Sequence, residues 1–308
     1  MKKRKKKIPQ EKKLFSNKQL IIISFALVAI IVLGFLLSSF LLQTQEVKFS
    51  LKAAIIDQLG KEFPNPQFVD NVTDILTDAE FNVTYHESER LDVNFFKGLA
   101  KYDYGIIILR VHSALRDDNS TVDLFTAESF DEHVHIQDLN NGLLVKGILN
   151  YPQDPKEYFA LTSKFIESLE GTFPKSIVVA MGCWSLKPEC KQTAEAFRSK
   201  GAEAYIGWTD MVDPNHTDDE TIKLLRMLLK QDKTIHDATR STSPDWRYSS
   251  AMKYYPESAG SLKISSLIAE AKASSNHQSA ITFKPMSAIY ITSFILLKTR
   301  KRFRYDLC

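Results

Sequence analysis

Two residues capable of nucleophilic and acid–base chemistry each follow an apolar run of the kind that forms a buried strand. His112 comes directly after residues 104–111. Cys183 comes after residues 176–181, with Gly182 in between. A thiolate is a strong nucleophile, and an adjacent imidazole removes the thiol proton or stabilises the thiolate as an ion pair. Neighbouring strands of a parallel sheet lie about 5 Å apart, so we expect a His112/Cys183 dyad at one edge of such a sheet.

Residues beside this pair are candidates for holding a substrate. Gly182 gives the backbone room for a tight turn next to Cys183, and backbone N–H groups in such a turn suit an oxyanion. Trp184, Trp208 and Asp210 fall at the same predicted edge of the sheet, and we interpret them as a candidate substrate pocket. An acid such as Asp210 suits a basic side chain in the substrate.

Short apolar runs alternate with helical patterns along most of the chain, which is typical of βαβ units and a parallel sheet. Besides the two strands before His112 and Cys183, the pattern predicts strands at 53–57, 81–85 and 202–207, and helices at 66–79, 93–100, 162–169, 189–200 and 217–230. From 116 to 151, shorter runs predict strands or hairpins set on the main sheet. Residues 240–266 predict a loose wrap with a short helix. We therefore expect an α/β fold with a doubly wound, mainly parallel sheet.

The order of these elements resembles the caspase, gingipain and separase superfamily of cysteine peptidases. In that superfamily one apolar strand ends in a histidine, and a later strand ends in a small residue and a cysteine, as at His112 and Gly182-Cys183. The part after the cysteine looks like the CHAT branch, in which a helix with an "AF…GA" element leads into a strand. Here that element is Ala196-Phe197 followed by Gly201-Ala202, and a short helix with Ala238 comes later. The resemblance covers residues 53–238.

This resemblance implies a caspase-like fold with Cys183 as the nucleophile and His112 as the general acid and base. The substrate would be a peptide or protein, and neither a cofactor nor a metal is implied. The backbone N–H of the residue after the histidine, Ser113 here, would help to form the oxyanion hole. The family usually has glycine at that position, and its peptidases often have Cys-x-Ser-Gly where this chain has Ser185-Leu186. The serine at residue 113 puts the expected activity in question more than the expected fold.

A disulfide between Cys183 and Cys190 is the alternative to a nucleophilic thiol. Six residues separate the two cysteines, and disulfides persist outside the cytoplasm. Such a bond would leave a catalytically inactive, caspase-like binding or scaffold domain. A metal site at His133 and His135 lacks a third spaced ligand in the sequence, so we expect a solvated loop and no metal there.

An uncharged, largely apolar run at 20–42 predicts a transmembrane helix. Its 23 residues reach roughly 34 Å, enough for a hydrocarbon core of ~30 Å. No small-residue cleavage site follows, as a signal peptide would require. Nine Lys/Arg precede the run, and basic residues stay on the cytoplasmic side. We therefore expect a cytoplasmic tail at 1–19 and an extracytoplasmic caspase-like domain at 47–270, held at the cell membrane.

The C-terminal end leaves two interpretations open. Residues 280–297 are apolar enough for a second transmembrane helix, with a basic tail at 298–308, but Pro285 and the length of only 18 residues argue against a span. Both ends of the chain are basic, while acidic residues outnumber basic ones in between. The basic N-terminal tail suits contact with anionic lipid headgroups, and the acidic balance of the part in between argues against nucleic acid as a partner.

Overall fold

The computed structural model describes residues 22, 24–34, 48–149 and 154–282 of the chain. The chain divides into two units, Met1–Lys48 and Phe49–Cys308. Residues 22 and 24–34 of the first unit are helical. Among the described residues, no helix combines the length and the apolar character needed to cross a membrane. Much of the predicted span at 20–42 lies outside the described residues, as do 283–297 of the second candidate and both basic tails.

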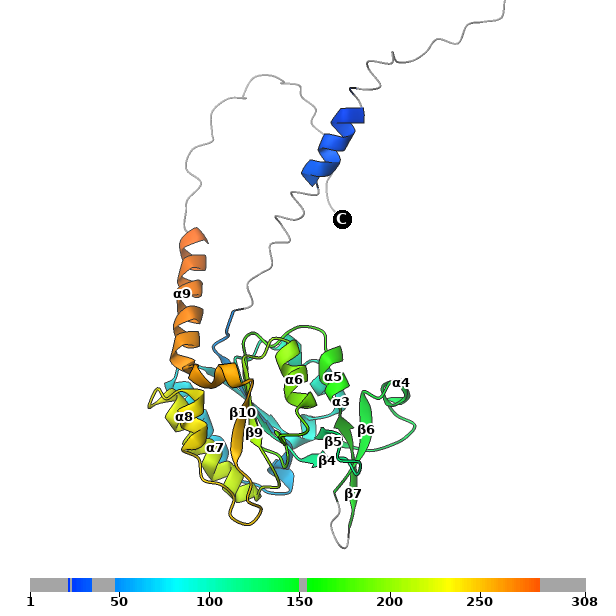
Figure 1. The fold of residues 1–308 in the computed structure, drawn as a ribbon, viewed down its shortest axis with the longest axis vertical. Coiled ribbons are helices and arrows are strands. Elements are labelled where there is room, and N and C mark those ends of the chain that lie inside the picture. Colours follow the sequence, from blue (N-terminus) through cyan, green and yellow to red (C-terminus); the bar gives the residue numbers. More distant parts are fainter. Residues whose placement is uncertain (1–21, 23, 35–47, 150–153, 283–308) are drawn as a thin grey trace, which may run out of the picture. The chain divides into compact units, whose positions relative to one another are not determined.

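A six-stranded sheet forms the centre of the second unit (Figure 1). The strands follow the order β10-β9-β8-β3-β1-β2, and all are parallel to their neighbours except β10, which runs antiparallel to β9. Their bounds are Lys52–Asp57 for β1, Asn82–Glu87 for β2, Ile106–Arg110 for β3, Ile177–Ala180 for β8, Ala204–Trp208 for β9 and Met252–Tyr255 for β10. The prediction of an α/β fold with a mainly parallel sheet is confirmed.

Helices cover both faces of this sheet, as a doubly wound fold requires. One face packs against α2 (Pro66–Asp78), α7 (Pro214–Leu229), α8 (Ile235–Arg240) and α9 (Ile264–Thr282). The other packs against α3 (Val93–Lys97), α5 (Ser163–Ser168) and α6 (Gln192–Ser199). Side chains of a strand point alternately to the two faces, so Ile106 and Ile108 join the first core and Ile107 and Leu109 the second. The described residues of this part also form short 3₁₀ helices, namely η1 (Gln58–Lys61), η2 (Ser88–Arg90), η3 (Leu99–Lys101) and η4 (Glu257–Ser261).

A second, antiparallel sheet begins directly after His112. It has four strands in the order β4-β5-β7-β6, with bounds Ser113–Leu115, Val122–Ser129, Lys156–Leu161 and Leu144–Leu149 in that order, and α4 (Ile136–Asn140) lies between β5 and β6. The strands predicted within 116–151 are present as β5 and β6. They form a separate sheet because each pairs with β7, which lies beyond the predicted segment. This sheet packs on the main one and buries Leu124, Leu144 and Phe159 in the second core.

Two further elements differ from the predicted pattern. Residues 252–255 form β10, although 240–266 predicts a loose wrap; the strand has only four residues and owes its existence to pairing with β9. Helix α7 begins at Pro214 because the Asp213 carboxylate accepts hydrogen bonds from the N–H groups of Asn215 and His216. A capping aspartate followed by proline is a strong helix start.

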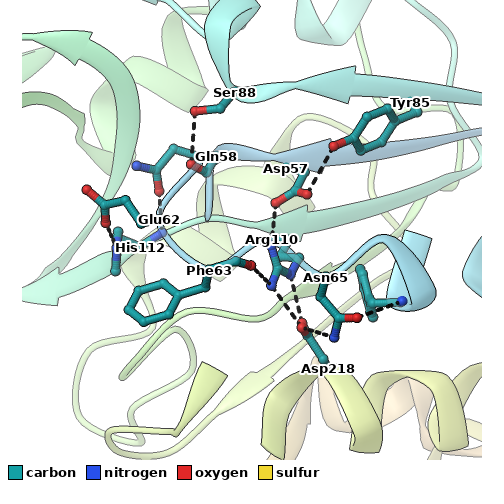
Figure 2. Close-up of polar contacts among 11 residues, drawn as sticks. Asp57, Gln58, Glu62, Phe63, Asn65, Tyr85, Ser88, Arg110, His112 and Asp218 are labelled. Atoms are coloured by element: carbon teal, nitrogen blue, oxygen red, sulfur yellow. Dashed lines mark hydrogen bonds and ion pairs between the residues drawn. The ribbon is translucent and has the colours of Figure 1, made fainter. Parts of the chain in front are cut away.

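The side chain of Arg110 is buried at the end of β3, with 1% of it exposed. Its Nη1 donates to Asp57 Oδ1 at 2.7 Å, its Nε and Nη2 donate to the two carboxylate oxygens of Asp218 at 2.8 Å each, and Nη2 also donates to the Phe63 carbonyl (Figure 2). The guanidinium also lies 5.4 Å from the ring centre of Phe68. Each of the three guanidinium nitrogens thus has an acceptor, as a buried charge requires.

Two carboxylates share this single guanidinium. Burial raises the pKa of Asp57, although Arg110 opposes the shift. Burial also opposes the charged form of Arg110, but Asp218 and Asp57 outweigh it and raise the pKa of the guanidinium. The Tyr85 hydroxyl donates to Asp57 at 3.2 Å, and burial together with the Asp57 charge raises the pKa of Tyr85 to about 12. The cluster therefore holds Tyr85 protonated and Arg110 charged.

We predict that Arg110→Ala lowers the free energy of unfolding by about 3–5 kcal/mol, because it leaves Asp57 and Asp218 buried without a counter-charge. Chemical denaturation of the full chain measures the change. Lys101→Ala, which breaks an exposed pair with Glu170, is the control and should leave the unfolding midpoint nearly unchanged. Equal midpoints for the two variants would contradict the central role of Arg110.

Candidate functional site

The strands that lead to His112 and Cys183 are direct neighbours. β3 pairs with β8 in parallel, with Leu109 opposite Ala180, so the two segments leave the same edge of the sheet side by side. Beyond the strands, the Ser113 hydroxyl donates to the Cys183 carbonyl at 2.6 Å. The predicted placement of the histidine and cysteine segments on adjacent parallel strands is confirmed.

Gly182 permits this close approach. A Cβ atom at residue 182 would lie 2.5 Å from the Val111 carbonyl oxygen and 2.9 Å from the Ser113 backbone nitrogen. Both distances are far shorter than a carbon atom tolerates, and both neighbours are backbone atoms that cannot turn aside. The absence of a side chain at Gly182 therefore allows the two segments to pack closely, in addition to allowing the turn that the sequence predicts.

His112 is positioned by the segment that follows β1. Its backbone N–H donates to Gln58 Oε1 at 2.8 Å, and its ring Nε2 lies 3.0 Å from Glu62 Oε2 (Figure 2). The imidazole packs edge-on against Phe63 and Phe125, with ring centres 6.2 and 6.3 Å away. A carboxylate on one ring nitrogen fixes the orientation of an imidazole.

Glu62 also ties His112 to the second sheet. Its Oε1 accepts from Lys156 Nζ at 2.9 Å and from the Tyr158 hydroxyl at 3.2 Å, both on β7. The side chain of Glu62 is therefore held from two directions and has little freedom to leave the imidazole. Nothing in the sequence pattern singles out Gln58 or Glu62, because they lie in a turn about 50 residues before the histidine that they contact.

The thiol of Cys183 lies against the loop between β9 and α7. The Val212 N–H points at Sγ from 3.5 Å, and Sγ lies 3.7 Å from the Val212 carbonyl oxygen. Burial raises the pKa of the Cys183 thiol above its usual range; the hydrogen bond from Val212 opposes this, and the charges of Asp210 and Asp245 add to it. The resting thiol is therefore protonated near neutral pH, and a nucleophile requires transfer of its proton to a base.

The segments of His112 and Cys183 meet, and each side chain also has partners of its own. The imidazole contacts Glu62, Phe63 and Phe125, whereas the thiol contacts the backbone of Val212. In this arrangement the imidazole is oriented by a carboxylate and the sulfur by a backbone N–H.

Two hollows flank His112. One of about 540 Å³ is lined by Glu62, Phe63, Lys156 and Tyr158, among others. The other, of about 690 Å³, is lined by Trp184, Phe125, Arg116 and Lys146, among others. Phe125 contacts the His112 ring from the second hollow and Phe63 contacts it from the first. Neither His112 nor Cys183 is itself among the residues that line these two hollows.

The three predicted pocket residues have different surroundings. Trp184 lines the larger of these hollows. Asp210 lies close enough to Cys183 to disfavour the thiolate, and its carbonyl accepts from the Trp184 N–H at 2.9 Å. The interpretation of Trp208 as a pocket residue is wrong. Its side chain is 0% exposed, belongs to the core and donates from Nε1 to Thr217 Oγ1 at 2.8 Å, because β9 directs it inward.

The predicted alternative of a Cys183–Cys190 disulfide is also wrong for this structure. Both cysteines are free thiols. Cys190 Sγ donates to the Asn119 carbonyl at 3.3 Å, while Cys183 Sγ contacts Val212. The two sulfurs thus point to partners on different segments of the chain.

In the part of the chain that the structure describes, no group of three His, Cys, Asp or Glu side chains is arranged to hold a metal ion. Of the two histidines considered for this role, His135 lies with Nε2 2.9 Å from Glu128 Oε1 and packs against Phe159. The His133 side chain is exposed.

No protein-family model matches the chain, and no curated protein sequence matches it either.

We predict that alkylation of Cys183 by iodoacetamide has its pH midpoint above that of the same thiol in the unfolded chain, because burial and nearby carboxylates raise the pKa of the folded thiol. Asp210→Asn removes one of these charges, so it should lower the midpoint and speed labelling near neutral pH. Peptide mass spectrometry of the full chain measures the rate at this residue. A midpoint at or below that of the unfolded chain would contradict the environment described for Sγ.

Proposed function

We propose that this chain is a caspase-like cysteine endopeptidase, anchored in the cell membrane by residues 20–42, that acts outside the cytoplasm through Cys183 and His112. The observation that carries the proposal is the pairing of β3 with β8, which brings a cysteine and a carboxylate-bound histidine to one edge of a parallel sheet. Functional groups of open α/β sheets collect at the carboxyl ends of the strands.

The proposed reaction begins with transfer of the Cys183 thiol proton to His112. The thiolate then attacks the carbonyl carbon of a peptide bond, and backbone N–H groups near Ser113 and Gly182 bind the oxyanion. The protonated imidazole gives its proton to the leaving amine, which leaves an acyl-thioester on Cys183. His112 next removes a proton from water, and attack by the hydroxyl on the thioester releases the second product.

In this scheme Glu62 is a positioning residue. Its carboxylate holds the imidazole and stabilises the imidazolium that forms when the thiol proton is transferred. The raised pKa of Cys183 makes this support more important, because the thiol is not ionised in advance. Substrate binding would have to bring the imidazole and the sulfur into contact, as catalytic hydrogen bonds often tighten only in the substrate complex.

The substrate of such a peptidase would be an extended peptide or protein segment, and the two hollows beside His112 are the candidate binding places for its side chains. Trp184 offers an apolar surface in one of them, and Asp210 would favour a basic side chain near the sulfur. The basic tail at 1–19 would lie on the cytoplasmic side, against anionic lipid headgroups. The acidic balance of the residues between the two basic ends fits a protein ligand better than a nucleic acid.

A non-catalytic recognition domain is the second candidate, and one observation favours it. Both reactive side chains are engaged in the resting structure: the thiol is protonated and held by Val212, and the imidazole by Glu62. A domain of this kind would bind an extended peptide in the same hollows without cleaving it. It would not need the Cys183–Cys190 disulfide that the sequence suggests as a cause of inactivity.

We predict that the full chain, in a non-ionic detergent, cleaves a fluorescently labelled unfolded protein. Cys183→Ser and His112→Ala should each lower the rate by about a thousandfold, because either change removes the nucleophile or its base. Cys190→Ser is the matched control and should retain activity. Binding of the labelled protein without cleavage, unchanged by Cys183→Ser, would reject the peptidase and support the recognition domain.

We also predict that Glu62→Gln lowers kcat by about tenfold or more while KM stays nearly constant, because the imidazolium loses its counter-charge. The pH dependence of kcat should shift as well, which a merely structural contact would not produce. Lys156→Gln removes another partner of the same carboxylate and should change kcat much less. Equal effects of the two substitutions would contradict the positioning role of Glu62.

A further inference from the structure

A third hollow, of about 740 Å³, follows the edge of the main sheet at β10. It is lined by the last residue before β10 and the whole of the strand, by α8, and by the segment after Cys183 that contains Leu186 and Lys191. Figure 1 shows β10, in orange, between β9 and the yellow helix α8. None of the residues assigned above to the catalytic site lines this hollow, so it needs an explanation of its own.

β10 is the last strand of the sheet on this side. The Ala251 carbonyl accepts from the Thr209 N–H, and Lys253 lies opposite Gly207 in the ladder with β9. In an antiparallel pair, residues alternate between bonding to the partner strand and pointing away from it. The backbone N–H and C=O groups of Met252 and Tyr254 therefore point outward, as a template for another strand.

The hollow reaches both faces of β10. On one face Lys253 and Tyr255 lie beside Lys191, whose Nζ is 6.0 Å from the ring centre of Tyr255. On the other face the Tyr254 hydroxyl lies 3.0 Å from His236 Nδ1 on α8, which also carries Arg240. A strand added here would have its alternate side chains held on both faces.

The charged side chains that line this hollow are mainly basic. Lys191, Arg240 and Lys253 are exposed, and within the described ranges none of them takes part in an ion pair, while Glu257 is the acidic residue of the lining. This basic cluster contrasts with the acidic balance of the sequence between its two basic ends. The positive charge of this cluster favours an acidic partner. The unpaired backbone groups of β10 favour a partner in extended conformation.

We propose that the groove along β10 binds an acidic peptide segment in extended conformation, which adds to the sheet as a further strand. Backbone hydrogen bonds to Met252 and Tyr254 supply affinity, and Lys191, Arg240 and Lys253 select acidic side chains. Pairing of β10 with β10 of a second copy is disfavoured, because it brings two basic clusters together. The proposal does not depend on peptidase activity.

Fluorescence anisotropy tests the charge selection on the full chain in a non-ionic detergent. The probe is a labelled peptide of alternating Glu and Val, and a peptide of alternating Lys and Val is its control. Arg240→Glu and Lys253→Glu should each weaken binding of the acidic peptide by about tenfold. Lys164→Glu, an exposed change on α5, should leave binding unchanged. Absence of binding, equal binding of both peptides, or equal affinity of all variants would overturn the proposal.

Hydrogen exchange of single backbone amides tests the added strand. The acidic peptide should slow exchange at Met252 and Tyr254, whose N–H groups point outward, with little change at Lys253, which already bonds to β9. Binding without this protection would place the peptide elsewhere and overturn the proposal. Protection of both amides without peptide, together with a dimer in sedimentation, would overturn it in favour of a second copy of the chain.

Discussion

Arg110 carries its charge into the interior where the ends of β1 and β3 meet the first turns of α7. Such a charge is stable only if carboxylates and carbonyls surround it, and Asp57, Asp218 and the Phe63 carbonyl do so. These contacts fix the segment between β1 and α2 against the sheet. That segment carries Gln58 and Glu62, so the position of the His112 ring depends on an ion pair to which the ring itself does not belong.

The sulfur depends on a second arrangement. The loop between β9 and α7 places Val212 against Cys183, and this loop is held in turn by Asp245, whose carboxylate accepts from the Asp213 and Arg247 N–H groups at 2.8 Å each. The position of the Val212 N–H at the thiol thus depends on these hydrogen bonds, while burial, with a smaller contribution from nearby carboxylates, keeps the thiol protonated. The same loops favour a nucleophile that forms only when a substrate is present, which is the form of catalysis proposed here.

The proposed peptidase site and the proposed peptide groove occupy different edges of one sheet. The first uses the carboxyl ends of β3 and β8, where loops converge, and the second uses the unpaired side of β10. The segment after β8 borders both, since it carries Cys183 near its start and Leu186 and Lys191 further on. An extended segment bound along β10 would therefore lie next to the chain that leads to the nucleophile.

The sequence by itself determined the central strands and the order of reactive residues, because strands buried on both faces are continuous apolar runs and their ends are marked by polar residues. His112 and Cys183 were found in this way, and so were α2, α3, α5, α6 and α7. Tertiary structure decided what short segments cannot encode. β10 exists only because β9 pairs with it, and the second sheet only because β7 supplies a partner. Trp208 and Trp184 look alike in sequence, yet the backbone directs one into the core and the other into a hollow. Glu62 reaches His112 across 50 positions of the chain, and such contacts arise from folding, which brings distant charges together where water is excluded.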